Sequence, residues 1–508
     1  MSVTLRISVS MILVSLASIG SLAQSNVTSP LLLKTSDHEL QRTFDWAKSQ
    51  ALAYVGPQGD AVGDWYEAAL PGRNAFCMRD VSHQTMGAHA LGLAANNHNM
   101  LRQFAQNISE SKDWASYWEI DRNGKPSPAD YLSDDDFWYN LPANFDLMSA
   151  ALRMYSWTGD NTYLNDPIFS RFYDHTVSEY PMRWSLDSSA LKTRNRIMNK
   201  RLSEGKFVED RGIPSYTEGQ DDFVIGVDLM AAEYRALRFA ADLARFRQQS
   251  STARQYDHRA DAIQDLIETK AWNPVTRHFY GFMGTNQKFF GEGDTFVLYF
   301  SAIKDFNEIQ GALNVIKAQI GISAPNIEAQ SYFPEILYRY GAGEAAYDQI
   351  LDLSRADRER REYPEVSYSI IGAIVTGMMG VNVVSPWQAR GDNEQATRTV
   401  IRTLPQLSKH SERVELDRLP VRDNVIDISH EVNRASSLTN VSGPALLWEP
   451  SFYGRWRFFM VDGKKVATVL TTDGQHRSIT KASILVPSNS KKVVTVMSKI
   501  QPDARVKR

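Results

Sequence analysis

The chain alternates between two kinds of predicted helix, and this alternation limits the folds that it can adopt. Residues 36–55, 100–110 and 253–270 are typical of helices with one apolar face and several charged or polar side chains. Between such segments lie helices that are apolar on most sides and rich in small residues, such as residues 81–95 and 364–379. A helix of the first kind has one face in water, whereas a helix of the second kind is buried on all sides. Two concentric layers of helices satisfy both requirements.

About twelve helices are predicted before residue 380 from this periodicity. They cover residues 36–55, 81–95, 100–110, 141–157, 160–180, 227–248, 253–270, 295–303, 306–320, 330–340, 344–355 and 364–379. We therefore expect a mainly α protein whose domain over residues 30–400 is an (α/α)6 toroid of six helical hairpins.

The pattern changes after residue 380, where apolar and polar residues begin to alternate with the period of a β-strand. Asp462-Gly463 lies between two such runs, which is a strong signal for a tight hairpin. We expect residues 401–508 to form a C-terminal antiparallel β-domain resembling a sandwich.

The N-terminus is typical of a secretory signal peptide. Arg6 provides the basic start, residues 9–19 form a short apolar core, and Ser21-Leu22-Ala23 resembles a cleavage site. We expect residues 1–23 to be removed near Ala23 and the protein to be exported to the periplasm or the extracellular space. No later segment is long and apolar enough to predict a membrane span. The formal net charge of −3 gives no indication of a nucleic-acid partner.

Polar and aromatic motifs precede every second predicted helix. They include Cys-Met-Arg-Asp at 77–80, Ser-Asp-Asp-Asp-Phe-Trp-Tyr-Asn at 133–140, Thr-Glu-Gly-Gln-Asp-Asp at 217–222 and Arg-Glu-Tyr-Pro-Glu at 361–365. In an alternating toroid these connections all emerge at the same end. Residues far apart in the sequence are therefore predicted to converge on one site.

An acidic and aromatic site suits carbohydrate chemistry, because sugars stack on aromatic rings and glycosidic cleavage uses two carboxyl groups. The layout resembles the six-hairpin glycosidases, which include trehalase, glucosidase I-type α-glucosidases and glucoamylase. At the level of architecture the resemblance covers most of the mature chain. Gly219-Gln220-Asp221-Asp222 resembles the segment that carries the general acid in the trehalase and glucosidase I families. Arg79-Asp80 resembles the pair that holds sugar hydroxyls in glucoamylase-like enzymes.

The resemblance implies Asp221 as general acid, with Glu218 as the first alternative and Asp222 as the second. One of these three carboxylates is also expected to cap the following helix. Glu365 is implied as general base, with Glu362 as its alternative, although a Glu at a helix start also has an ordinary electrostatic role. The implied reaction is inverting hydrolysis without a metal or other cofactor.

The remaining candidates would bind substrate. They are Arg79, Asp80, His83, Trp138, Tyr139, Asp222, Gln330, Tyr332 and Tyr368. Each has a structural alternative, since a buried ion pair, a core histidine or a core aromatic residue needs no ligand.

These observations predict an exported glycoside hydrolase that acts on an oligosaccharide or polysaccharide. Two alternatives remain from the sequence. A polysaccharide lyase would use a Tyr or His base beside the sugar's carboxylate, and His83, Tyr216 and Tyr368 are available for that role. A non-catalytic glycan-binding protein would keep the aromatic residues without needing facing carboxylates.

Overall fold

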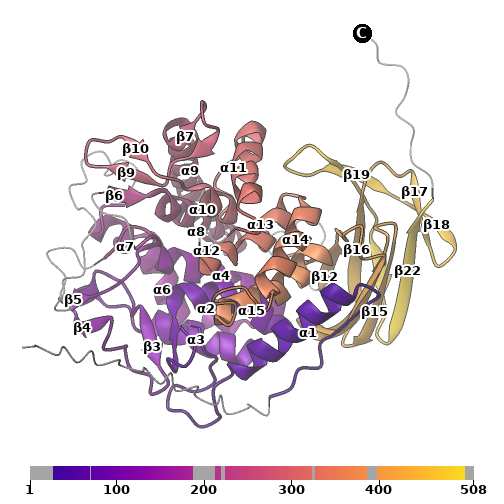
Figure 1. The fold of residues 1–508 in the computed structure, drawn as a ribbon, viewed down its shortest axis with the longest axis horizontal. Coiled ribbons are helices and arrows are strands. Elements are labelled where there is room, and N and C mark those ends of the chain that lie inside the picture. Colours follow the sequence, from indigo (N-terminus) through magenta and orange to yellow (C-terminus); the bar gives the residue numbers. More distant parts are fainter. Residues whose placement is uncertain are drawn as a thin grey trace, which may run out of the picture.

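The computed structural model describes residues 27–68, 70–186, 212–218, 223–322, 326–385 and 398–497. It consists of a helical domain followed by a strand-rich C-terminal region, which lies beside the helices (Figure 1). The helices are α1 (His38–Ala53), α2 (Met78–Ala90), α3 (Ala94–Gln106), η1 (Glu110–Lys112), α4 (Pro142–Thr158), α5 (Thr162–Asn165), α6 (Pro167–Val177), α7 (Glu179–Arg183), α8 (Val227–Phe246), α9 (Ser250–Leu266), η2 (Ile267–Ala271), α10 (Asp294–Tyr299), α11 (Phe306–Ala318), α12 (Ile327–Gln330), α13 (Phe333–Arg339), α14 (Gly343–Ser354), α15 (Pro364–Ala373) and η3 (Ile374–Met378).

The predicted helices are confirmed, with two informative differences in their limits. The helix expected at 81–95 begins at Met78, so Arg79 and Asp80 belong to its first turn rather than to a preceding loop. The helix expected at 160–180 is divided into α5, α6 and α7. Pro167 has no N–H to continue a helix, and the Asp166 side chain accepts a hydrogen bond from the backbone N–H of Ile168 and so begins α6 anew.

Six buried helices contact one another in a closed cycle among the described residues. The order of contact is α2, α4, α8, α10, α13, α15 and back to α2. Helices α3, α6, α9, α11, α14 and α1 pack against these six from outside. Almost every residue of α2 and α15 is buried, whereas α1 buries one stripe that includes Leu40, Phe44 and Ala47. The two kinds of helix predicted from the sequence thus take different places in the packing.

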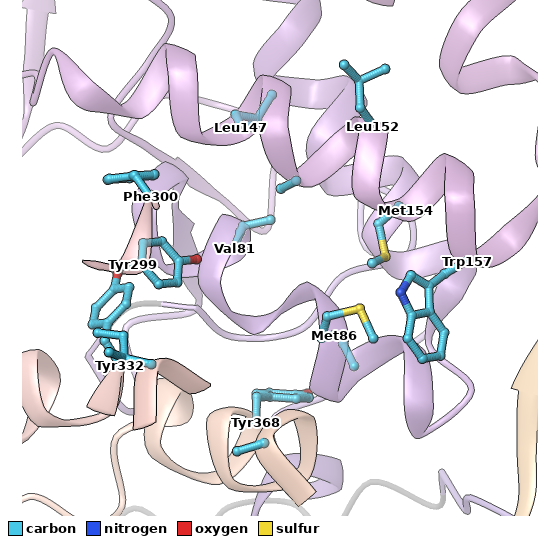
Figure 2. Close-up of a cluster of buried hydrophobic side chains, with 14 of the residues drawn as sticks. Val81, Met86, Leu147, Leu152, Met154, Trp157, Tyr299, Phe300, Tyr332 and Tyr368 are labelled. Carbon is cyan, nitrogen blue, oxygen red and sulfur yellow. The ribbon is translucent and has the colours of Figure 1, made fainter. Parts of the chain in front are cut away.

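The interior of the helical domain is filled by large apolar and aromatic side chains (Figure 2). Val81 and Met86 come from α2, Leu147 and Trp157 from α4, and Tyr299 from α10. Because these residues come from different helices of the cycle, their packing joins those helices to one another.

The strand-rich region contains two sheets. One has the order β1-β13-β14-β15-β22-β17-β18, and the other has the order β11-β12-β16-β20-β19, with β21 also paired to β16. Their strands are β1 (Leu32–Thr35), β11 (Val381–Val383), β12 (Val400–Thr403), β13 (Arg413–Val421), β14 (Asn424–Glu431), β15 (Ala435–Ser442), β16 (Leu446–Tyr453), β17 (Phe458–Val461), β18 (Lys464–Ala467), β19 (Val469–Thr472), β20 (Ser478–Lys481), β21 (Ile484–Val486) and β22 (Ser490–Val496).

Most of these strands pair antiparallel, as predicted, but β12 and β16 pair in parallel. The predicted hairpin is confirmed, because Val461 of β17 pairs with Lys464 of β18 around Asp462-Gly463, both of which have positive φ. Strand β1 precedes the helical domain in the chain and nevertheless pairs with β13. The N-terminal segment therefore belongs to the C-terminal sheet.

Short strands also occur within the helical domain. They are β2 (Ala75–Cys77), β3 (Glu119–Asp121), β4 (Tyr131–Ser133), β5 (Asp136–Phe137), β6 (Phe223–Gly226), β7 (Trp272–Asn273), β8 (His278–Phe279), β9 (Phe282–Gly284) and β10 (Phe289–Phe290). Strands β2 and β6 lead directly into α2 and α8, so they fix where those helices begin.

Candidate functional site

Arg79 and Asp80 occupy the first turn of α2. Nε of Arg79 lies 3.0 Å from Oδ1 of Asp80. The Arg79 guanidinium also lies 5.8 Å from the centre of the Tyr216 ring and 6.0 Å from that of Trp118. Both distances suit a cation–π interaction, so two aromatic rings and one carboxylate hold this guanidinium in a defined position.

Glu365 lies in the first turn of α15, directly after Pro364, and is only 4% exposed. Because α15 packs against α2, the charge of Asp80 reaches Glu365. Burial raises the pKa of Glu365 well above its ordinary value, and Asp80 raises it further, while Arg79 acts in the opposite direction. Burial also raises the pKa of Asp80, against the opposing effect of Arg79. Two buried carboxyl groups therefore compete for one guanidinium.

Glu218 joins this group from the segment before α8. Asp80, Glu365 and Glu218 are among the groups that raise the pKa of Arg79 above its ordinary value. Burial of Arg79 acts in the opposite direction and lowers that pKa. Glu218 is exposed, in contrast to the other two carboxyl groups. The structure thus brings together four residues predicted from the sequence, which come from the starts of α2 and α15 and from the segment before α8.

Asp221 and Asp222 lie outside the described residues. Shortly before them in the chain, Ser215 and Tyr216 are held by Asp228 in the first turn of α8. Its carboxylate accepts hydrogen bonds from Ser215 Oγ at 2.9 Å and from the Tyr216 N–H at 2.5 Å. This anchoring places the chain that enters the acidic segment next to Arg79.

His83 and Tyr332 stack one turn deeper in the same region. Their ring centres are 3.8 Å apart with an interplanar angle of 17°. His83 Nε2 lies 3.1 Å from Ser331 Oγ, and burial lowers the pKa of this histidine to about 4. His83 is therefore neutral at neutral pH, and both side chains are almost fully buried.

Three other predicted substrate-binding residues are buried and bonded to protein groups. The Tyr368 hydroxyl donates to the carbonyl oxygen of Ala51 at 2.8 Å, and Gln330 Nε2 donates to that of Ile322 at 2.9 Å. The Tyr139 hydroxyl lies 2.5 Å from Oδ1 of Asn144. These contacts give the three side chains packing roles in the domain interior. Trp138, in contrast, is only half-buried.

Three carboxyl groups that support the site, two of them buried, were not predicted from the sequence. Asp146 of α4 accepts a hydrogen bond from the Tyr216 hydroxyl at 3.1 Å, and burial raises its pKa to about 7. Burial raises the pKa of Asp228 to about 6. Glu328 of α12 raises the pKa of both Asp80 and Glu365, after larger effects from burial. The sequence signal that could have identified such a group is a single carboxylate within an otherwise apolar helix, as at Asp146.

Comparison with solved structures identifies the architecture. An α-L-rhamnosidase from Dictyoglumus thermophilum is 13% identical, with a TM-score of 0.56 over 93% of this chain and 51% of its own. A GH78 rhamnosidase from Bacillus sp. GL1 is also 13% identical, with a TM-score of 0.54 over 80% of this chain and 40% of its own. A proposed kojibiose phosphorylase from the human microbiome is 11% identical, with a TM-score of 0.51 over 91% and 68% of the two chains.

This chain has the fold of the six-hairpin glycosidases. It spans 51% and 40% of the lengths of the two rhamnosidases. No protein-family model matches the sequence, and no curated protein is significantly similar to it. Among the described residues, no helix has both the length and the apolar character that a membrane span requires.

Proposed function

We propose that this protein is a glycoside hydrolase whose helical domain is an (α/α)6 toroid. The closed cycle of α2, α4, α8, α10, α13 and α15 supports this architecture, with these six helices as the inner ring. One observation carries the functional proposal. On a glycosidase fold, Arg79, Asp80 and Glu365 come together at the starts of inner helices, and Glu218 joins them from the segment before α8.

In the proposed reaction, a carboxyl group of the segment 218–222 protonates the leaving oxygen. Asp221 takes this role, with Glu218 as the first alternative and Asp222 contributing to substrate binding. Glu365 acts as the base that activates water, and Arg79 with Asp80 binds sugar hydroxyls through charge-assisted hydrogen bonds. Inversion at the anomeric carbon requires the acid and the base to stand about 6.5–9.5 Å apart, with a water between them.

The environments of the alternative bases favour hydrolysis over a lyase reaction. His83 is buried and stacked on Tyr332. Burial raises the pKa of Tyr216 and of Tyr368 well above the ordinary value, and their hydroxyls are bonded to Asp146 and to Ala51. A lyase base must instead reach a proton of the substrate. The facing carboxyl groups also argue against a protein that only binds glycans.

We further propose that residues 1–23 form a signal peptide cleaved near Ala23, which would export the enzyme. The proposed domains are a catalytic domain over residues 30–400 and a β-sandwich-like domain over residues 401–508. The substrate would be an oligosaccharide or polysaccharide.

The first test compares the wild type with Glu365→Gln on a panel of aryl glycosides and oligosaccharides. The panel includes an α-L-rhamnoside, because two structural neighbours are rhamnosidases. We expect sugar release by the wild type and a loss of about 10²–10⁴-fold in Glu365→Gln, because a general base contributes about this much to the rate. Azide, which attacks without a base, should restore part of the lost activity.

Glu362→Gln is the matched control, because Glu362 is three residues away and its side chain is 55% exposed. It should retain the wild-type rate, and a selective loss in this variant would move the base to Glu362.

Asp221→Asn tests the proposed acid. Because this variant cannot protonate the leaving oxygen, it should retain most activity only on substrates whose leaving group needs no proton. A wild type that releases no sugar but forms an ultraviolet-absorbing unsaturated product would contradict the proposal in favour of a lyase.

A further inference from the structure

A cavity of about 420 Å³ lies between the helical domain and the strand-rich region. Its helical wall comes from the C-terminal half of α4, the middle of α8, α13 and η3, and its other wall comes from β11, β12 and the loop before β20. Arg79, Asp80 and Glu365 of the proposed site lie in the first turns of α2 and α15, whereas η3 follows the C-terminal end of α15. None of them lines this cavity.

The helical wall carries three guanidinium groups, and one carboxylate, that of Glu335, pairs with two of them. Oε1 of Glu335 lies 3.2 Å from Nη1 of Arg153 and 2.6 Å from Nη2 of Arg339. Nη1 of Arg235 donates to the carbonyl oxygen of Tyr299 at 2.8 Å, and Arg339 donates to the same oxygen. Among the described residues, no carboxylate lies within ion-pair distance of Arg235.

The other charged residues of the cavity do not balance this excess. Arg402 pairs with Glu449 at 2.7 Å, and Arg477 pairs with Asp473 at 2.6 Å, so these two arginines already have carboxylate partners. Asp146, which does not line the cavity, also interacts with Arg235, but its hydrogen-bond partner is the Tyr216 hydroxyl. Burial raises the pKa of Asp146 to about 7, so this carboxyl group is partly protonated at neutral pH.

Arg235 itself reports the imbalance. Burial lowers its pKa to about 10, and repulsion by Arg339 and Arg153 adds to this shift, while Tyr299 and Glu335 act in the opposite direction. Arg235 and Arg339 both donate to the carbonyl oxygen of Tyr299 at the C-terminal end of α10. This oxygen carries no full negative charge, so it does not cancel the two positive charges. The helical wall therefore carries more positive than negative charge, and it faces a cavity that is large enough for a small molecule.

We propose that this cavity binds a small molecule through a phosphate, sulfate or carboxylate group held by Arg153, Arg235 and Arg339. Guanidinium groups present paired N–H donors that match the geometry of such oxyanions. The volume falls in the range of small-ligand pockets, so the cavity admits a free oxyanion or a single sugar that carries an acidic group. A neutral sugar lacks the charge that this wall would neutralise.

The test is a thermal-unfolding titration of the full-length protein at constant ionic strength. Inorganic phosphate, glucose 6-phosphate and glucuronate are compared with chloride and with neutral glucose. A ligand that binds only the folded state raises the Tm as its concentration increases. We expect at least one of the three anions to raise the Tm beyond the effect of chloride, and the strongest of them distinguishes a free ion from an acidic sugar.

Arg235→Gln should move the half-saturating concentration at least tenfold higher, whereas Arg254→Gln, an exposed arginine on the neighbouring helix α9, should leave it unchanged. If Arg235→Gln does not fold, Arg235→Lys and calorimetric titration of the wild type replace it, and binding should weaken without being lost. An equal response to chloride and to the three anions overturns the proposal. An equal loss of binding in Arg235→Gln and Arg254→Gln does so as well.

Discussion

Asp80, Arg79 and Glu365 act as one electrostatic unit. Each of the two carboxyl groups is buried, and each interacts with the same guanidinium. Burial and the charge of Asp80 together make Glu365 hold its proton to a higher pH than an ordinary glutamate does. A base in this position works only after that proton has left, so the rate should depend on pH through Glu365.

Asp80→Asn should therefore shift one limb of the pH profile of kcat/KM. Removing the negative charge lowers the pKa of Glu365, and a base with a lower pKa is deprotonated down to a lower pH. We expect the acidic limb to move to lower pH, even if substrate binding is weakened as well. The measurement is kcat/KM from pH 4 to pH 9, with Asp423→Asn as an exposed control in the strand-rich region.

Movement of the alkaline limb instead would mean that Glu365 is the proton donor, which would reverse the two proposed roles. If neither limb moves, Glu365 does not titrate in the rate-limiting process.

Position relative to helix starts allowed part of this site to be predicted. The resemblance to six-hairpin glycosidases implies Arg79, Asp80 and Glu365, which precede or begin apolar helices, and these three do interact. Tyr139, Gln330 and Tyr368 are also predicted to bind substrate, but their polar atoms bond to the protein interior. Whether a polar atom faces a ligand or a backbone carbonyl depends on side-chain direction, which the sequence pattern does not contain.

Helices were predicted well because their periodicity is a local property. The small residues of the inner helices had a further meaning that appears only in the packing. At Gly87 of α2, an added Cβ would lie 2.0 Å from the carbonyl oxygen of Tyr368 in α15. The two backbones can approach this closely only because residue 87 has no side chain.

Gly87→Ala should therefore destabilise the protein, although alanine is normally the better helix former by about 1 kcal/mol. Backbone atoms cannot move aside as a flexible side chain can, so we expect a loss of about 1–3 kcal/mol in the free energy of unfolding. Urea denaturation measures this change. Gly474→Ala is the control, because nothing lies within 4 Å of its added Cβ. Equal stability of the two variants would show that α2 and α15 do not pack this closely.

At the scale of the whole molecule, β1 joins the beginning of the chain to its C-terminal sheet. Leu33 pairs with Leu416 of β13, and the hydrogen bond from Thr35 to Arg413 links residues that are 378 positions apart. This pairing was not predicted, because a strand of four residues gives almost no local signal and its partner is distant in the sequence.

Leu33→Asp should weaken the pairing of β1 with β13, since the Leu33 side chain is only 4% exposed. Its neighbour Leu32, on the opposite face of the same strand, is 48% exposed and serves as the control position. Burying a carboxylate without a partner is strongly unfavourable. We expect Leu33→Asp to lower the Tm and to speed hydrogen exchange in β13 and β14, while Leu32→Asp leaves both close to the wild type. Similar behaviour of the two variants would contradict the pairing.

The pairing of β1 with β13 also has a kinetic consequence. The residues of β1 are made before the helical domain, yet their partner strand is made only after the whole helical domain. Closing so long a loop is entropically unfavourable unless the helices have already condensed and brought its ends together. Docking of β1 is therefore a late step in folding, and until it occurs the edge of β13 remains open to pairing with another chain.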